Sequence, residues 1–281
     1  MSFKSRADDR ADFSICLTNH NSVFPPHNVA IEAEDRDFQG FFLPENSHVP
    51  IDRSRTYRKF DGIEKLAKFF DPFVALAACA AVTKKIKLGT SVCLLTQRDP
   101  GITADAIASL ESISDHRCVI GVAGGFVAEA MENHGSEFHR RWEIVKEHVY
   151  LMRKQWNSVN RKNKNNGTEV KPFNTPIWIG SNSKHVPDRV AAYADGWLNR
   201  RELFKGNAAN ALRIACKKIN RPIGEITLVM MGAPTDVDEI KAAISQGYQH
   251  FIYFVSDSNR DDLLQNLDSI AAVKNRLLIK S

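Results

Sequence analysis

Residues 86–100 have the sequence IKLGTSVCLLTQRDP, an apolar run that ends in polar residues. The run Ile86–Leu95 is short and rich in leucine, which is typical of a strand with both faces buried. The segment Ile102–Ile113 follows with apolar residues at three- and four-residue spacing, which predicts a helix. A strand followed by a helix is the repeating unit of a parallel β/α fold.

The same unit occurs eight times along the chain. The expected strands are Phe13–Leu17, Gly40–Leu43, Ile86–Leu95, Cys118–Val122, Ile177–Gly180, Gly196–Leu198, Ile226–Met231 and Phe251–Val255. The expected helices are Asn28–Asp37, Pro72–Thr83, Ile102–Ile113, His139–Trp156, Val186–Ala194, Ala208–Ile219, Asp236–Ser245 and Asp261–Leu277. Eight units predict an α/β fold of the closed (β/α)8 TIM barrel type. A doubly wound open sheet is the alternative, but the first strand runs into Thr18-Asn19-His20 without the glycines that such sheets use.

Eight units account for nearly all of the 281 residues, so we expect a single domain over residues 1–281. The polar stretch over residues 158–171, which contains NRKNKNNGTEV, is predicted to be a flexible loop within that domain. Two interpretations of this loop remain open. It is either a solvated connection without function or, because it precedes the fifth expected strand, a lid over the site.

Composition excludes several classes of protein. A hydrophobic share of 43% and a net charge of +5 are ordinary for a globular chain, permit an anionic ligand and do not indicate a nucleic-acid partner. No run approaches about 18 uncharged apolar residues, and the charged first residues lack an apolar signal core, so we expect neither a membrane span nor a secretion signal. Five well-separated cysteines without a C-x-x-C pair indicate reduced core thiols in a cytoplasmic protein.

The barrel prediction locates the chemistry, because active sites of such barrels lie at the carboxyl ends of the strands. The residues expected there are Asn19, His20, Glu45, Asn46, His48, Thr96, Gln97, Arg98, Gly124, Gly125, Gly180, Ser181, Asn182, Asn199, Arg200, Arg201, Gly232, Ser256 and Asp257. No strong metal-ligand spacing occurs among them, so no metal is expected. The chain also lacks a G-x-S-x-G elbow, which argues against a serine hydrolase.

A glycine-containing turn follows the fifth expected strand. Gly180-Ser181-Asn182-Ser183 lies between a strand and a helix, where glycine allows close backbone approach and a helix amino end favours anions. The turn is either a phosphate cradle or an ordinary connection with a capping serine.

Several motifs in order resemble one known family. DPFVALAACAAVTKKI (Asp71–Ile86), KLGTSVCLLTQRDP (Lys87–Pro100) and LESISDHRCVIGVAGGF (Leu110–Phe126) follow one another, and AMENHG (Ala130–Gly135), RRW (Arg140–Trp142), PIWIG (Pro176–Gly180) and RVAAYADGW (Arg189–Trp197) come later. This order resembles the luciferase-like monooxygenase superfamily, and within it the class of coenzyme F-420-dependent oxidoreductases. The resemblance runs from about Gly40 to Trp197 and continues weakly to the C-terminus.

The resemblance implies a barrel-shaped oxidoreductase or monooxygenase that uses FMN or coenzyme F-420, and it does not distinguish the two cofactors. It implies a homodimer that acts on a small-molecule substrate, by oxygen activation or hydride transfer. Ser91 and Val92 match a non-proline cis peptide that backs the flavin ring, and Gly124 and Gly125 match a loop on the cofactor's side chain. Gly180 and Ser181, with Asn182 beside them, match the phosphate loop, and Arg98 matches a rim arginine.

The chain departs from the family pattern at the end of the second strand, where an acid is often followed by histidine. Here the pair is Glu45-Asn46. An imidazole can move a proton near neutral pH and an amide cannot, so either His48 or His20 supplies the base or none is needed. Glu45, Asn46, His48 and His20 are the expected substrate-side residues.

Two further hypotheses remain open. Asn46, together with a shorter stretch than usual between Trp156 and Pro172, is compatible with a non-catalytic flavin-binding homologue. An unrelated barrel enzyme with a phosphorylated substrate is the other. A basic rim around the site would favour coenzyme F-420, which has a polyanionic tail, unless the charges of the rim are merely solvated. The members of this rim would be Arg53, Arg55, Arg58, Lys59, Arg98, Arg200 and Arg201.

Overall fold

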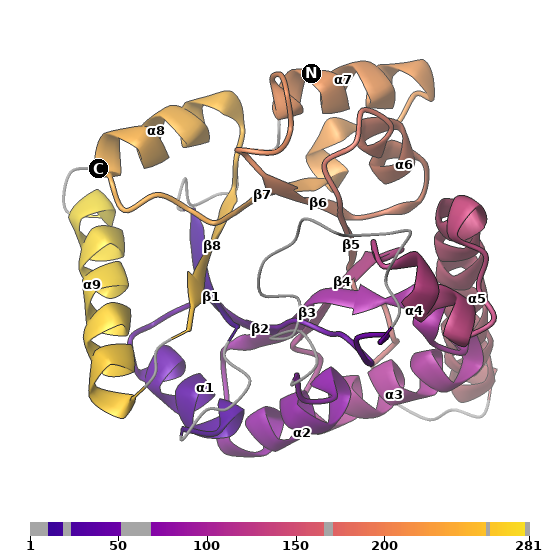
Figure 1. Cartoon of the computed structure of the whole chain (residues 1–281), viewed down its shortest axis with the longest axis horizontal. Coiled ribbons are helices and arrows are strands. Elements are labelled where there is room, and N and C mark those ends of the chain that lie inside the picture. The colour runs from indigo at the N-terminus through magenta and orange to yellow at the C-terminus, as the bar shows by residue number, and fades with distance from the viewer. Residues whose placement is uncertain (1–10, 19–23, 52–68, 166–170, 257–258, 279–281) are drawn as a thin grey trace.

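The computed structural model describes residues 11–18, 24–51, 69–165, 171–256 and 259–278. Its strands close into a parallel barrel in which each strand pairs with its neighbours in chain order and β8 pairs with β1 (Figure 1). The strands are β1 (Asp12–Leu17), β2 (Gly40–Leu43), β3 (Lys87–Leu94), β4 (Cys118–Ala123), β5 (Ile177–Gly180), β6 (Gly196–Arg200), β7 (Thr227–Met231) and β8 (His250–Val255). The predicted (β/α)8 barrel and all eight expected strands are confirmed.

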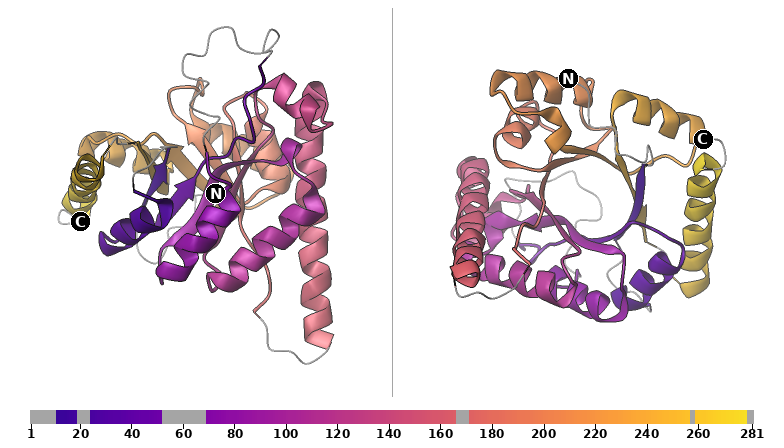
Figure 2. Two further views of the ribbon diagram at one scale, coloured as in Figure 1. Left: turned by 60° about the horizontal axis from the view of Figure 1, so that its bottom comes forward. Right: turned by 180° about the vertical axis from the view of Figure 1, so that it is seen from behind.

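Helices surround the barrel on its outside (Figures 1 and 2). They are α1 (Pro26–Asp35), α2 (Pro72–Val82), α3 (Pro100–Ile113), α4 (Ala128–Asn133), α5 (Arg141–Asn165), α6 (Val186–Tyr193), α7 (Ala208–Lys218), α8 (Val237–Gln246) and α9 (Arg260–Leu278). The short helix α4 was not expected, because six residues are too few to show a helical period. In the part of the chain that the structure describes, no helix is long and apolar enough to cross a bilayer.

Two Asp-Pro pairs determine where α2 and α3 begin. The Asp71 carboxylate accepts hydrogen bonds from the backbone N–H groups of Phe73 and Val74, and Pro72 occupies the first helical position. Asp99 accepts in the same way from the N–H of Ile102 ahead of Pro100. A capping carboxylate satisfies helix donors that otherwise lack a partner, and proline has no N–H to satisfy. The caps therefore fix the residues at which α2 and α3 begin.

The barrel interior is filled by side chains that alternate with those facing the helices. Cys16, Phe42, Val119, Trp178, Leu198, Val229 and Ile252 form the inner cluster. Glycines make room for its two largest members: a Cβ atom at Gly89 would meet the Phe42 ring and the Val119 carbonyl oxygen, and one at Gly196 would meet the Trp178 indole. The interior is therefore a packed core, as in other barrels of this type.

The five cysteines are all buried and free of disulfides, as expected for core thiols. Burial raises the pKa of Cys16, Cys79 and Cys118 to about 12. These thiols are therefore protonated at neutral pH.

The predicted loop over 158–171 begins too early, because α5 continues to Asn165. No glycine or proline interrupts the sequence before Gly167, and Lys162 and Lys164 in the last turn complement the negative carboxyl end of the helix dipole. The Asn160 side chain also binds both backbone groups of Phe173, at 3.0 Å and 2.9 Å, and so fastens the returning chain to α5. Residues 166–170 lie outside the described residues.

The lid interpretation of this segment is wrong. The chain that leaves α5 enters β5 at its amino end, so it meets the face of the barrel opposite to the carboxyl ends of the strands. In Figure 2 the carboxyl end of α5 extends beyond the barrel, away from the chain that follows β2. The number of residues between Trp156 and Pro172 therefore does not affect the substrate side of a site at the carboxyl ends of the strands.

Replacing Gly89 by alanine tests the packing of the interior. The new methyl group would collide with the Phe42 ring and a β4 carbonyl, so we expect Gly89→Ala to lower the free energy of unfolding by about 1–3 kcal/mol in urea denaturation. Ser109→Ala on the exposed face of α3 is the control, with an expected change within about 0.5 kcal/mol. Equal stability of Gly89→Ala and the wild type would contradict this account of the core.

Candidate active site

The fold brings most of the predicted site residues to one end of the barrel. Glu45, Asn46 and His48 follow β2, and Arg98 follows β3. Gly124 and Gly125 follow β4, whereas Gly180 ends β5 and Ser181 and Asn182 come next. His20 lies outside the described residues, as do Asn19 and Asp257 of the rim and Arg53, Arg55, Arg58 and Lys59 of the expected basic rim.

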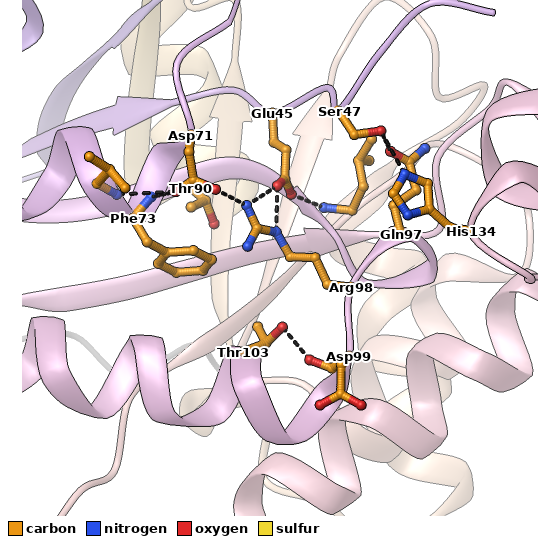
Figure 3. Close-up of polar contacts among 12 residues, drawn as sticks. Glu45, Ser47, Asp71, Phe73, Thr90, Gln97, Arg98, Asp99, Thr103 and His134 are labelled. Atoms are coloured by element: carbon orange, nitrogen blue, oxygen red, sulfur yellow. Dashed lines mark hydrogen bonds and ion pairs between the residues drawn. The ribbon is translucent and has the colours of Figure 1, made fainter.

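Glu45 and Arg98 form the best-connected ion pair of the described part of this end (Figure 3). One Glu45 carboxylate oxygen accepts from Nε of Arg98 at 2.5 Å and also contacts its Nη2. The other oxygen accepts from the backbone N–H of Leu94 at 2.7 Å. The Glu45 side chain is 7% exposed. Its carboxylate is therefore fully occupied in joining the end of β2 to the end of β3.

Arg98 extends this connection to α2. Its Nη2 donates to the Asp71 carboxylate at 2.6 Å, and its guanidinium lies 4.9 Å from the centre of the Phe73 ring. Burial alone would lower the pKa of Arg98 and raise that of Asp71. The hydrogen bond between Arg98 and Asp71 opposes both of these effects of burial, and the hydrogen bond and negative charge of Glu45 act on Arg98 as well. The pKa of Arg98 is therefore raised and that of Asp71 is lowered. Arg98 and Asp71 are therefore both charged at neutral pH.

Asn46 shapes the chain after β2. Its side-chain Nδ2 donates to the backbone carbonyl of His48 at 2.8 Å, which closes a short turn. The amide that occupies the position of the family's usual histidine is thus engaged with the backbone. His48 stands two residues further along this turn.

A polar cluster joins this turn to α4. The Ser47 hydroxyl donates to Oε1 of Gln97 at 2.8 Å and contacts Nε2 of His134 at 3.0 Å (Figure 3). It also contacts Nδ1 of His48 at 2.9 Å. Asn133 Nδ2 lies 2.9 Å from Nε2 of His48. Burial lowers the pKa of His134, and the neighbouring His48 and Arg98 lower it further against the opposing charge of Glu45.

Sequence reasoning did not select Ser47, Asn133 or His134. The last two lie in the AMENHG segment, which was noticed only as a family match. The signal that could have found them is a histidine in the chain after the fourth strand, where side chains can meet those that follow the second.

The Ser91–Val92 peptide bond is cis, as the resemblance implies. The pairing of β3 with β4 shifts register between Thr90 and Cys93. The Ser91 side chain is buried, and Val92 packs on the inner cluster. A Cβ atom at Gly180 would collide with Val92, so glycine at the end of β5 leaves room for that side chain.

The chain after β4 is tightly placed. Gly125 has φ +70°, a backbone conformation that favours glycine. The Gly124 carbonyl accepts from the Thr96 hydroxyl at 3.1 Å, and a Cβ atom on Gly124 would come within 3.2 Å of the Arg141 side chain at the start of α5. These two glycines therefore hold the β4 turn close to β3 and α5.

The turn after β5 is tied to β6. The Ser181 carbonyl accepts from Nε1 of Trp197 at 2.8 Å, and Oδ1 of Asn182 accepts from the backbone N–H of Arg200 at 2.9 Å. Asn182 therefore has a structural partner, whereas the Ser181 side chain is partly exposed and Ser183 is exposed.

Two arginines that sequence reasoning did not select lie near this turn. Arg189 donates to the Ser183 hydroxyl at 3.3 Å and lies 4.4 Å from the centre of the Trp142 ring. Burial lowers the pKa of Arg189, and the nearby charge of Arg141 lowers it further. The guanidinium of Arg189, with the Ser183 hydroxyl beside it, suits a phosphate group.

The described members of the expected basic rim all have carboxylate partners. Arg98 binds Glu45 and Asp71, Arg200 lies 3.7 Å from Glu202, and Arg201 lies 2.8 Å from Glu239. Among the described residues, no group of three histidine, cysteine, aspartate or glutamate side chains could hold a metal ion.

Comparison with known proteins gives consistent matches. The sequence profile of the family described as luciferase-like monooxygenase matches residues 22–276. A protein of Mycobacterium tuberculosis whose function is uncharacterised is 24% identical over 277 residues, which cover 92% of this chain and 97% of that protein. A phthiodiolone/phenolphthiodiolone dimycocerosates ketoreductase of Mycobacterium sp. (strain JLS) is 25% identical over 247 residues, covering 82% of this chain and 60% of that protein.

Solved structures share the fold. The monooxygenase RslO1 of Streptomyces bottropensis superposes with a TM-score of 0.71 at 14% identity, covering 96% of this chain and 99% of that one. An F-420-dependent secondary alcohol dehydrogenase in complex with an F-420-acetone adduct gives a TM-score of 0.71 at 13% identity, covering 95% and 99%. Barrels of this shape therefore include both a monooxygenase and an F-420-dependent dehydrogenase.

Removal of Arg98 tests the connection between β2, β3 and α2. Arg98→Met leaves the nearly buried Glu45 carboxylate without a counter-ion, so we expect a loss of about 3 kcal/mol of unfolding free energy in urea. Arg201→Met removes an exposed ion pair and is the matched control, with an expected effect below about 1 kcal/mol. The double variant Arg98→Met/Glu45→Gln should regain part of the loss. Equal effects of Arg98→Met and Arg201→Met would refute a special role for Arg98.

Proposed function

The chain belongs to the luciferase-like monooxygenase family, and on that premise we propose that it is an oxidoreductase that binds FMN or coenzyme F-420 at the carboxyl ends of the barrel strands. Its substrate is a small organic molecule. The cofactor would supply the redox chemistry, and the protein would supply binding, orientation and exclusion of water.

The observation that carries the proposal is the set of groups beside the β5 turn. Gly180 leaves room for Val92 at the end of β5, the Ser181 and Ser183 hydroxyls can donate, and the guanidinium of Arg189 lies 3.3 Å from the Ser183 hydroxyl, with the charge of Arg141 acting on it. Both candidate cofactors carry a phosphate group, and guanidinium groups with hydroxyl donors suit phosphate. The residues present therefore fit either cofactor at this turn, with the ring end toward Ser91 and Val92.

The choice between the two cofactors stays open. A basic rim would favour the polyanionic tail of coenzyme F-420, but Arg98, Arg200 and Arg201 have carboxylate partners. Their charges are therefore less available to a ligand than the sequence suggested. The solved relatives include both a monooxygenase and an F-420-dependent dehydrogenase.

The substrate side would be formed by the chain after β2. Glu45 is held by Arg98 and Leu94, and Asn46 is held by the backbone of His48, so both would position this chain. In this segment after β2, His48 has an imidazole, a group that can exchange a proton near neutral pH. His48 would therefore be the residue that handles a substrate proton.

A non-catalytic flavin-binding homologue is the second candidate, and the amide at position 46 favours it. The two candidates share cofactor binding and differ in turnover. Screening alcohols, aldehydes, ketones and alkanes with the loaded protein separates them, since the second predicts binding without product.

A homodimer is part of the proposal. The outer face of α2 is apolar, with Val74 73% exposed, and Ile102 on α3 is 72% exposed. Exposed apolar residues on neighbouring helices suit burial against a second copy. Light scattering on purified protein should give about 63 kDa, twice the 31.5 kDa of the chain, and a value of one chain would contradict the dimer.

Cofactor binding is tested by titrating the apo-protein with FMN and with coenzyme F-420, followed by absorbance and calorimetry. We expect one of them to bind in the micromolar range. Arg189→Met should weaken binding by about tenfold or more, because it removes a charge-assisted hydrogen bond to phosphate. Arg201→Met, which changes charge equally at an exposed site, should leave the affinity unchanged. If neither cofactor binds at tens of micromolar, the proposal fails.

A further inference from the structure

The Ser47 hydroxyl is the junction of a hydrogen-bond network that links the chain after β2 to the ends of β3 and α4. It has three side-chain partners within 3.0 Å, namely Gln97, His48 and His134. A hydroxyl group has one proton to donate and two lone pairs with which to accept. Three partners therefore use its full capacity, and each of them has a defined role.

Gln97 determines the direction of the network. Its Oε1 is an acceptor, so the single Ser47 proton points to it at 2.8 Å. Gln97 is 7% exposed, and its Nε2 lies on the side of Gly125, which leaves Oε1 toward Ser47. With its proton committed, the Ser47 oxygen must accept from both imidazoles.

The two imidazoles then have opposite tautomers. His48 donates from Nδ1 to Ser47 and keeps a lone pair on Nε2, and Asn133 donates its amide N–H to that nitrogen at 2.9 Å. His134 donates from Nε2 and keeps its lone pair on Nδ1. This one assignment satisfies the three side-chain contacts of Ser47 and the contact of His48 Nε2 with Asn133.

The surrounding charges favour a neutral His134 ring. The ring centres of His48 and His134 are 5.5 Å apart, and Arg98 adds a positive charge from the end of β3, whereas Glu45 opposes it from the end of β2. The pKa of His134 is lowered by its burial and by these cations. His134 is therefore neutral at pH 7 and donates through one nitrogen only, as the assignment requires.

We propose that Ser47, oriented by Gln97, is a positioning residue that fixes the tautomers of His48 and His134 and so presents Nε2 of His48 as the proton acceptor of the site. The inference rests on the proposed oxidoreductase function and deepens it. When a hydroxyl-bearing substrate is oxidised, Nε2 would take the hydroxyl proton, with an N–H bond formed as the O–H bond breaks, and the hydrogen of the adjacent C–H bond would leave with its electron pair to the cofactor of the proposed function. When a carbonyl substrate is reduced, Nε2 would return the proton to the carbonyl oxygen as that hydride is added to the carbonyl carbon.

The substrate hydroxyl would replace Asn133 at this nitrogen. Asn133 is exposed, so its amide can leave without disturbing the core. Asn46 supports the same arrangement, since its bond to the His48 carbonyl sets the turn that presents the ring. The chain would thus use a histidine two residues beyond the position at which the family often has one.

The tautomers are measured without any cofactor, by long-range ¹H–¹⁵N correlation spectra of ¹⁵N-histidine-labelled apo-protein at pH 8. We expect the Nδ1–H tautomer for His48 and the Nε2–H tautomer for His134. Ser47→Ala should give both rings mixed tautomers, whereas Ser47→Thr, which keeps the hydroxyl, should retain the wild-type spectrum. Ser109→Ala is the matched control and should change neither ring. His48 in the Nε2–H form, or fixed tautomers in Ser47→Ala, would overturn the proposal.

A second measurement follows the charge coupling of the rings. His48→Gln removes a cation that lowers the pKa of His134, so that pKa should rise in an NMR titration, and His139→Gln at an exposed site should leave it unchanged. An unchanged value in His48→Gln would contradict the coupling.

Turnover links the network to chemistry. With an active alcohol or ketone substrate, His48→Gln should reduce kcat by about 10²–10⁴-fold. Ser47→Ala should reduce it less and alter its pH profile, and Ser47→Thr should restore both. Failure of cofactor binding would remove the proposed function and leave the tautomer result standing, so the two failures can be told apart. Fixed tautomers with unchanged kcat in Ser47→Ala would overturn the positioning role.

Discussion

The guanidinium group of Arg98 is the contact on which the described part of the carboxyl end of the barrel depends. It binds Glu45 after β2, stands at the end of β3 and reaches the cap of α2 through Asp71. Three segments that are far apart in sequence therefore share one cation. Because the Glu45 side chain is nearly buried, its charge requires this partner, and the chain after β2 has its path restricted as a consequence.

That restriction positions the residues whose side chains can take part in a reaction. Once Glu45 is fixed, Ser47 and His48 stand opposite Gln97 and α4, where Asn133 and His134 complete the cluster. Structural and chemical roles are thus divided among four consecutive residues, Glu45 to His48. Glu45 and Asn46 hold the backbone, and Ser47 and His48 present hydrogen-bonding groups away from it.

The fold was predictable because its signals are local. A short apolar run is visible in the sequence itself, and so are the Asp-Pro caps of α2 and α3, so the strands and most helices were located within a few residues. The errors arose where a local signal was weak. Composition favoured a loop over residues 158–171, but helix termination needs a glycine, a proline or a lost contact, and Asn160 has its contact with Phe173.

The site was predictable only in part, for a related reason. Strand ends were correctly expected to bring Glu45, His48, Arg98 and Gly180 to one end of the barrel. Which of them bind one another depends on the paths of loops, and the sequence contains no period that reports such paths. The pairing of Glu45 with Arg98, the approach of His134 and the proximity of Arg141 to Arg189 are all of this kind.

The direction of α5 has a practical consequence. Its last turns extend past the barrel on the side opposite to the site, and Lys162 there is exposed (Figure 2). The five native thiols are buried, and burial raises the pKa of each, so thiol reagents would meet little competition from them. A single cysteine introduced at position 162 would therefore give a unique point of attachment to a surface or dye, with the barrel mouth left facing the solution.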